Sequence, residues 1–166
     1  MKNEEKLDIL WAPWRMDYIL GEKEEGCIFC SKVQENDDKK NLILYRGDHN
    51  FVIMNKYPYN NGHLMVVPYR HIAELEILED SESLEMIKII SKSIAVLKQT
   101  IHPEGLNIGL NIGTIAGAGI EDHLHFHIVP RWAADTNFMP VVGQTKVISE
   151  ALAKTWERLK ETFLTV

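Results

Sequence analysis

Three features are scarce in this sequence, and each narrows the class of protein. The 166 residues contain only two cysteines, and both belong to one Cys-x-x-Cys pair. No run of about 18 apolar residues occurs, and the charged start lacks the apolar stretch of a signal peptide, so we expect a cytoplasmic protein that makes no membrane contact. Lysine and arginine total 18 against 24 acidic residues, a net charge of −6, which argues against a nucleic-acid surface because phosphate backbones require dense positive charge.

The chain is long enough, and with 45% apolar residues hydrophobic enough, for one compact domain, which we place at residues 1–166. Within it, residues 7–20 carry two tryptophans around a proline. This stretch is too apolar for a free tail, so we expect it to pack on the body of the protein or on a partner subunit.

The most distinctive stretch is residues 123–129, where three histidines alternate with apolar residues. Alternation is the period of a β-strand, so His123, His125 and His127 are expected on one face, about 6.6 Å from each to the next. A single histidine would fit an ordinary polar strand face. Because imidazole can donate, accept, ligate a metal or attack as a nucleophile near neutral pH, three in strict alternation predict a reactive face.

The Cys27–Cys30 pair has two interpretations in a cytosolic chain, a redox dithiol or half of a metal site. A redox pair usually begins a helix after a strand, whereas the residues before Cys27 resemble a charged turn. Half of a zinc site needs two more ligands, and His71 and the histidine row offer them. We therefore favour zinc.

Periodicity predicts a meander of short strands followed by a long helix. Residues 31–41 read as a charged surface loop, followed by strands at 42–46, 50–55 and 63–68. Residues 81–101 read as an amphipathic helix capped by Asp80 or Ser81, and the apolar positions expected to face the sheet are Leu84, Ile87, Ile90, Ile94, Leu97 and Ile101.

Two further elements complete the pattern. Residues 105–113 alternate between Leu or Ile and Gly or Asn, which predicts a strand whose nearly bare second face lets a ligand approach. The last expected element is a C-terminal helix marked by Leu152, Trp156, Leu159 and Phe163.

Two sequence runs carry a resemblance to a known family. Residues His123-Leu-His-Phe-His127-Ile-Val, with the upstream run Asn55-Lys-Tyr-Pro-Tyr-Asn-Asn-Gly-His63-Leu-Met-Val-Val-Pro-Tyr-Arg-His71, resemble the histidine triad (HIT) family of nucleotide hydrolases and transferases. The resemblance covers about residues 26–131. Flanking motifs are similar to its diadenosine-tetraphosphate phosphorylase (ATP adenylyltransferase) branch, namely Trp11-Ala-Pro-Trp14-Arg-Met-Asp-Tyr-Ile, Ala116-Gly-Ala-Gly119 and Pro130-Arg-Trp with Asn137-Phe-Met.

This resemblance implies an α+β fold, with an antiparallel sheet, a long helix and a C-terminal helix, in a homodimer. It implies that His125 attacks the α-phosphorus of a nucleotide and forms a nucleotidyl-histidine, which water or phosphate then resolves. His127 would stabilise charge on the phosphate. His63 would support the triad by hydrogen bonding, and the alternative for His63 is a core histidine at a strand start.

The resemblance also implies how an adenine nucleotide or dinucleoside polyphosphate is held. Asn55 would contact the ribose and Asn111 the phosphate side, while Ile28 and Phe29 would line the base pocket or belong to the ordinary core. The family often has a polar pair before the triad, where this chain has Ala118-Gly119. Backbone amides of Gly117, Ala118 and Gly119 can replace those side chains, and Arg131 is a further candidate for holding inorganic phosphate.

By the same resemblance, a structural zinc would be held by Cys27, Cys30, His71 and His123, a closed tetrahedral set. Two other functions stay open at this point. One is a phosphoramidate hydrolase that uses the same His125, and the other is a non-catalytic, zinc-stabilised nucleotide-binding module.

Overall fold

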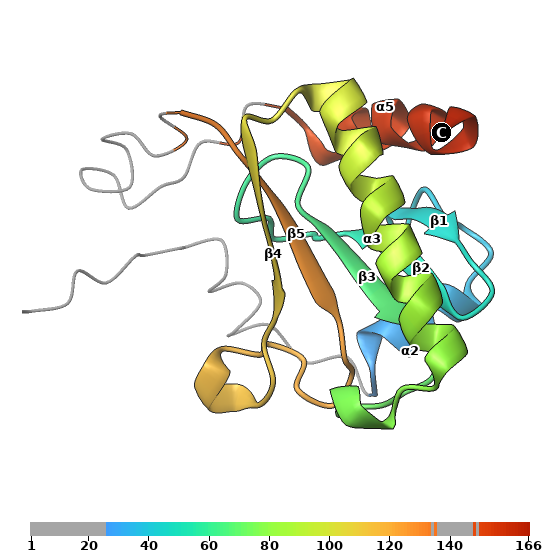
Figure 1. Ribbon diagram of the computed structural model, residues 1–166. Helices are drawn as coiled ribbons and strands as arrows, with labels where there is room; N and C mark the ends of the chain where they lie inside the picture. Colours follow the sequence, from blue (N-terminus) through green and yellow to red (C-terminus); the bar gives the residue numbers. More distant parts are fainter. Residues whose placement is uncertain (1–25, 134, 136–147, 149) are drawn as a thin grey trace, which may run out of the picture.

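A computed structural model describes residues 26–133, 135, 148 and 150–166 (Figure 1). Its strands form one antiparallel five-stranded sheet in the order β1-β2-β3-β5-β4. The strands are β1 (Ile43–Arg46), β2 (Asn50–Met54), β3 (Leu64–Pro68), β4 (Gly105–Leu110) and β5 (Phe126–Arg131). The helices are α2 (Ile28–Gln34), α3 (Asp80–Ile101) and α5 (Leu152–Thr165), with short 3-10 turns η1 (Leu75–Ile77) and η2 (Thr114–Ala116). The predicted α+β class is confirmed.

The two faces of the sheet have different covers. Figure 1 shows α3 crossing one face with α5 beside it, and α2 lying near the lower end of the sheet. Alternate residues of β3 divide accordingly, since Leu64 and Val66 belong to the core under α3 and α5, while Met65 and Val67 belong to a second core with Phe29 of α2. Residues 31–34, predicted as loop, continue α2 after the cysteine pair.

The predicted sheet-facing side of α3 is confirmed at four of its six positions, since Ile90 and Leu97 are buried and Ile94 and Ile101 pack partly buried against the core. Leu84 and Ile87 are 58% and 59% exposed, whereas Met86, Ile89, Ile90, Ser93, Val96 and Leu97 are buried. Apolar spacing of three and four describes two neighbouring stripes on this helix, and only packing on the sheet decides which stripe is buried. The helix also begins earlier than predicted. Its N-cap is Glu79 and not Asp80 or Ser81, and the Glu79 N–H donates to the Glu82 carboxylate at 2.8 Å.

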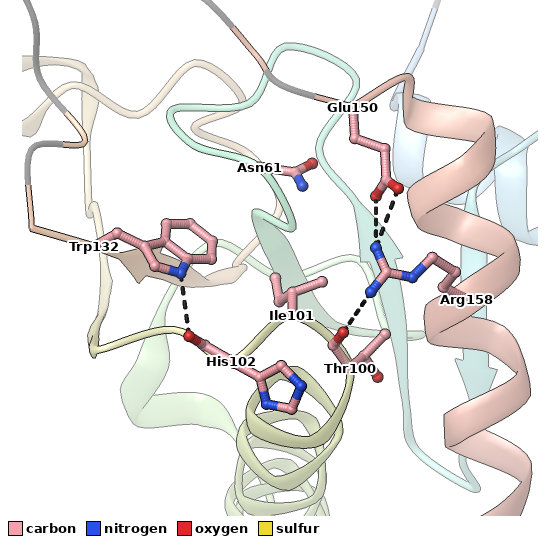
Figure 2. Close-up of a pocket in the computed structure, with 7 residues that line it drawn as sticks. All are labelled: Asn61, Thr100, Ile101, His102, Trp132, Glu150 and Arg158. Atoms are coloured by element: carbon pink, nitrogen blue, oxygen red, sulfur yellow. Dashed lines mark hydrogen bonds and ion pairs between the residues drawn. The ribbon is translucent and has the colours of Figure 1, made fainter.

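The ends of α3, β5 and α5 meet around a pocket (Figure 2). Arg158 donates to the carbonyl oxygen of Thr100 at 2.6 Å and to Glu150, and the Trp132 indole N–H donates to the carbonyl oxygen of His102 at 3.2 Å. The pocket contains no residue of the predicted site, and it lies past the end of β5 opposite to His125. Because its polar groups bond to one another, we interpret it as the junction that fixes α5.

The predicted packing of residues 7–20 and the Asn137-Phe-Met motif lie outside the described residues. Within the described part of the chain, no helix combines the length and apolarity that crossing a bilayer requires.

Candidate active site and metal centre

The histidine row begins before its strand. β5 starts at Phe126, so the strand predicted over residues 123–129 is shorter at its first end. The Leu124 N–H donates to the carbonyl oxygen of Ile72 at 2.6 Å, and the His123 carbonyl accepts from the His125 ring. The backbone here therefore pairs with the segment that follows β3 and with a side chain, rather than with a strand ladder.

The three imidazoles nevertheless share one face, the face away from α3. His127 lies opposite Met65 of β3 and Gly109 of β4 in the strand register. The Phe29 ring lies 5.3 Å from the ring of His123 and 5.2 Å from that of His125, between centroids. The His125 and His127 rings are 4.8 Å apart. The three histidines therefore lie on the face of the sheet that α2 covers, next to Phe29 of that helix.

Hydrogen bonds assign the tautomer of His125. Its Nδ1–H donates to the carbonyl oxygen of His123 at 2.8 Å, which leaves the lone pair on Nε2. The side chain is buried, and this burial lowers the pKa of His125 below the ordinary histidine value. A neutral ring with an oriented lone pair is what nucleophilic attack requires.

A second chain of hydrogen bonds assigns His127. The backbone N–H of Tyr59 donates to Nδ1 of His63 at 3.1 Å, so the proton of a neutral His63 ring is on Nε2. That Nε2–H donates to Nδ1 of His127 at 3.0 Å. Nε2 of His127 then carries a proton, which can be donated to an anionic oxygen. The supporting donor is a main-chain group of Tyr59, so no side-chain pattern in the sequence could have indicated it.

Beside His127 the described residues leave the sheet uncovered. A Cβ added to Gly109, the register partner of His127, would meet no atom of the described residues within 4 Å. This agrees with the bare strand face expected for residues 105–113.

Of the residues expected to bind the nucleotide, Phe29 contacts the histidine row, and two others already have hydrogen bonds within the protein. The Asn55 side chain accepts from the Tyr57 N–H at 2.9 Å, and the Asn111 side chain donates to the carbonyl oxygen of Gly117 at 3.4 Å. Phe29 is 1% exposed and belongs to the second core, whereas Ile28 is only partly buried.

The loop before the triad uses part of its own backbone. The Gly117 N–H donates to Thr114 at 2.9 Å and the Ala118 N–H to Gly113 at 3.3 Å, both to carbonyl oxygens. These two amides close the η2 turn, in which Gly117 has a φ of 87° that favours glycine.

Arg131 lies at the end of β5 that is far from His125. It is four residues past His127 on β5, about 13 Å along a strand. Its guanidinium bonds to Asp135 and to the side-chain oxygen of Asn107, and it holds the pKa of the Asp135 carboxyl well below its usual range. The expectation that Arg131 supports phosphate next to His125 is therefore not met by this arrangement.

Four candidate metal ligands meet at the start of the row. Sγ of Cys27 lies 3.1 Å from Nδ1 of His123, and Nδ1 of His71 lies 3.2 Å from the same atom. Sγ of Cys30 lies 3.5 Å from Nδ1 of His71, and all four ligand atoms lie within 4.8 Å of one another. Edges of roughly 3.3–3.8 Å are expected for a tetrahedral metal with two sulfur and two nitrogen ligands. The cluster can hold a metal.

The surroundings of the cluster fit this use. The Nε2–H of His123 donates to the carbonyl oxygen of Pro68 at 2.9 Å, which directs the Nδ1 lone pair to the cluster. Burial lowers the pKa of His123 and so favours the neutral, ligating ring. Partial burial and the neighbouring Cys27 raise the pKa of the Cys30 thiol, so a cation is needed to hold both sulfurs as thiolates.

Comparison with known proteins agrees with the geometry. The HIT domain family matches residues 36–134. A protein of Mycobacterium tuberculosis named AP-4-A phosphorylase is 42% identical over 159 residues, which cover 91% of this chain and 82% of that protein.

Solved structures agree on the fold. A hypothetical histidine triad nucleotide-binding protein from Sulfolobus tokodaii superposes with a TM-score of 0.68 at 26% identity, covering 84% of this chain and 93% of that chain. A zinc-bound histidine triad family protein from Mycobacterium smegmatis gives a TM-score of 0.68 at 22% identity, covering 84% and 94%. On the family match, the close relative and the histidine row together, the chain belongs to the HIT domain family.

Proposed function

We propose that this protein transfers an adenylyl group from dinucleoside polyphosphates, with diadenosine tetraphosphate as the substrate and an adenylyl-histidine as the intermediate. The observation that carries this proposal is the His125 ring, whose Nδ1–H is bonded to the His123 carbonyl so that Nε2 faces away with its lone pair. The 42% identical relative named AP-4-A phosphorylase supports the choice of substrate.

The remaining residues have defined parts in this reaction. His125 Nε2 attacks the α-phosphorus, the bond from phosphorus to the bridging oxygen breaks, and the rest of the polyphosphate leaves with its electron pair. His127 donates its Nε2–H to the phosphate, and His63 holds the tautomer that makes this donation available. Asn55, Asn111, Ile28 and the Gly117–Gly119 loop bind the nucleotide, and Phe29, which is buried in the second core, supports the base pocket from behind. A polyphosphate is a weak base, so its departure does not depend on a polar side chain at Ala118-Gly119.

Identification of the nucleotides released from diadenosine tetraphosphate tests the proposal. The first step releases ATP whichever acceptor follows, so ATP is expected as a product. Nucleotide binding without release of any ATP would favour a binding module instead.

We propose that the metal is zinc and that it is structural. Two thiolates and two imidazoles form a complete tetrahedral set with no position left for substrate, and all four donors lie close enough to share one ion. When bound, zinc would connect the start of α2 to the segment after β3 and to the histidine row.

About one zinc per chain is therefore expected in freshly purified protein, measured by elemental analysis. Cys27→Ser should lower the melting temperature by several degrees, because binding of a structural metal adds to folding stability. The protein that remains folded should keep most of its activity, because the proposed zinc takes no part in the reaction. Protein purified without chelators and free of zinc would contradict this assignment.

We also propose that two copies of the single domain at residues 1–166 form a homodimer across β4 and α3. β4 is an edge strand of the described sheet, and most of its residues are exposed. Ile108 lies opposite Ile128 in the register, so its side chain projects to the α3 face, where it is 43% exposed. Leu84 and Ile87, on the helix that covers the same face, are also exposed apolar side chains, and we propose that one isologous contact covers all three.

Substitution of Ile87 tests this dimer. Ile87→Glu should raise the dimer dissociation constant at least roughly tenfold, because a two-fold interface contains the substitution twice. Sedimentation velocity over a concentration series measures it. Leu164→Glu is the matched control, since Leu164 on α5 is also exposed, at 79%, and lies outside the proposed interface. An unchanged dimer in the Ile87→Glu protein would exclude this surface.

For its location we propose the cytoplasm, where thiols stay reduced and available to a metal.

A further inference from the structure

The segment from Pro68 to Ile72 brings His71 to the metal cluster and is bonded on the triad side at both of its ends. The Pro68 carbonyl accepts from the His123 ring, and the Ile72 carbonyl accepts from the Leu124 N–H. The side chain of His71 itself is 45% exposed, whereas His123 is 1% exposed. Packing alone therefore orients His71 less than it orients His123.

Asp122 does little to orient the side chain of His71. Its carboxylate lies 3.7 Å from Nε2 of His71, beyond hydrogen-bond distance, and its side chain is 62% exposed.

The neighbouring residue, Arg70, is held much more firmly. Its guanidinium donates to both carboxylate oxygens of Glu82, at 2.9 Å from Nε and 2.6 Å from Nη2, and also to the carbonyl oxygen of Ile77 at 2.7 Å. Glu82 is 6% exposed and accepts in addition from the Glu79 N–H at the start of α3. A two-point contact of this kind fixes direction as well as distance. It connects the first turn of α3 to the residue beside the metal ligand.

We propose that the Arg70–Glu82 ion pair is a positioning device for the metal centre: it fixes the backbone that carries His71, so that the N-terminus of α3 determines metal affinity. The pair touches neither metal nor substrate. It acts through His71, and it goes beyond the proposed nucleotide chemistry while resting on the proposed metal site. Groups hydrogen-bonded directly to a metal ligand typically contribute about tenfold to a hundredfold in metal affinity, and a contact that acts through the next residue is expected at the lower end of that range.

Glu82→Gln is the test. Glutamine still accepts the Glu79 N–H, so the helix start is kept, but the charge and the two-point contact with Arg70 are lost. The zinc dissociation constant, measured by chelator competition, should rise about tenfold. The absorption bands of the cobalt-loaded protein should also change, because they report the ligand geometry.

Glu85→Gln is the matched control. Glu85 lies on the same helix and accepts the N–H groups of Asp48 and His49, in the β1–β2 turn, and the side-chain amide of Asn50 at the start of β2, all at 2.7–2.8 Å. Its loss should lower the melting temperature without changing zinc affinity or the cobalt spectrum. Adding Arg70→Met to Glu82→Gln should weaken zinc binding no further, because the two residues act as one unit.

The outcomes are distinct. Wild-type zinc affinity and an unchanged cobalt spectrum in Glu82→Gln would overturn the positioning role and leave the metal site intact. An equal loss of zinc affinity in Glu85→Gln would overturn it as well, since the effect would then be general destabilisation. A wild-type protein that binds no zinc would overturn both the site and its positioning. Turnover of a dinucleotide is no part of these measurements, so failure of the proposed reaction is detected separately.

Discussion

Replacement of His125 with alanine is expected to lower the turnover of diadenosine tetraphosphate by at least about 10⁴-fold, while nucleotide affinity is retained. The reason is that the covalent step uses one atom, Nε2 of this ring, and no other imidazole of the row has the same orientation. His123 directs its Nδ1 to the metal cluster, and Nδ1 of His127 accepts from His63. Binding depends on Asn55, the base pocket and the loop before the triad, which this substitution leaves in place.

Single-turnover kinetics and equilibrium binding of ATP measure the two effects separately. His127→Ala should cost less, about 10²-fold to 10³-fold, because that ring donates a hydrogen bond without bonding to phosphorus. His49→Ala is the control, since His49 is exposed in the β1–β2 turn. Wild-type turnover in a clean His125→Ala preparation would disprove the covalent mechanism. A mass increase by one adenylyl group, trapped in the wild type and missing from His125→Ala, would support it.

The second large effect is a change of product with phosphate. With diadenosine tetraphosphate and saturating inorganic phosphate, the expected products are ATP and ADP, whereas hydrolysis would give ATP and AMP. Both routes begin with the same attack by His125, so the acceptor is chosen only when the His–P bond breaks. Phosphate must then lie in line with that bond while water is kept out.

The structure narrows the groups that can hold this phosphate. Arg131 is bonded to Asp135 and Asn107, and the amides of Gly117 and Ala118 close the η2 turn. Among the described residues, the surface at Gly109 is a candidate place for a second anion, because a Cβ added there would meet no atom within 4 Å. Chromatography of the products with and without phosphate makes the measurement. AMP as the partner of ATP at saturating phosphate would reject phosphorolysis and leave a hydrolase.

A good part of the fold and the cluster of site residues could be predicted from the sequence. Strict alternation was enough to put His123, His125 and His127 on one face, even though the first two precede the strand, because an extended backbone alternates with or without a ladder partner. The cysteine pair and His71 were grouped by the family resemblance, and the structure brings all of them to His123.

The parts that could not be predicted depend on contacts between distant segments. Nothing in the apolar spacing of α3 distinguishes Leu84 and Ile87, which are exposed, from Met86 and Ile89, which are buried, because the sheet selects the buried stripe. Tyr59 acts through a main-chain N–H, which has no residue signature. Arg131 was a candidate phosphate ligand because it is a cation close to the triad in sequence. Four residues of an extended strand nevertheless separate it from His127 by about 13 Å.

His123 belongs to two sites through two different parts of the residue. Its ring faces Cys27 and His71, whereas its carbonyl oxygen orients the His125 ring. Every amino acid supplies that carbonyl, so the orientation of the His125 ring depends on the path of the main chain and not on the identity of the first histidine. Evolution and protein engineering can therefore treat the two sites as separable: replacing all four ligands with a well-packed apolar cluster would give a metal-free lineage with the same phosphorus chemistry.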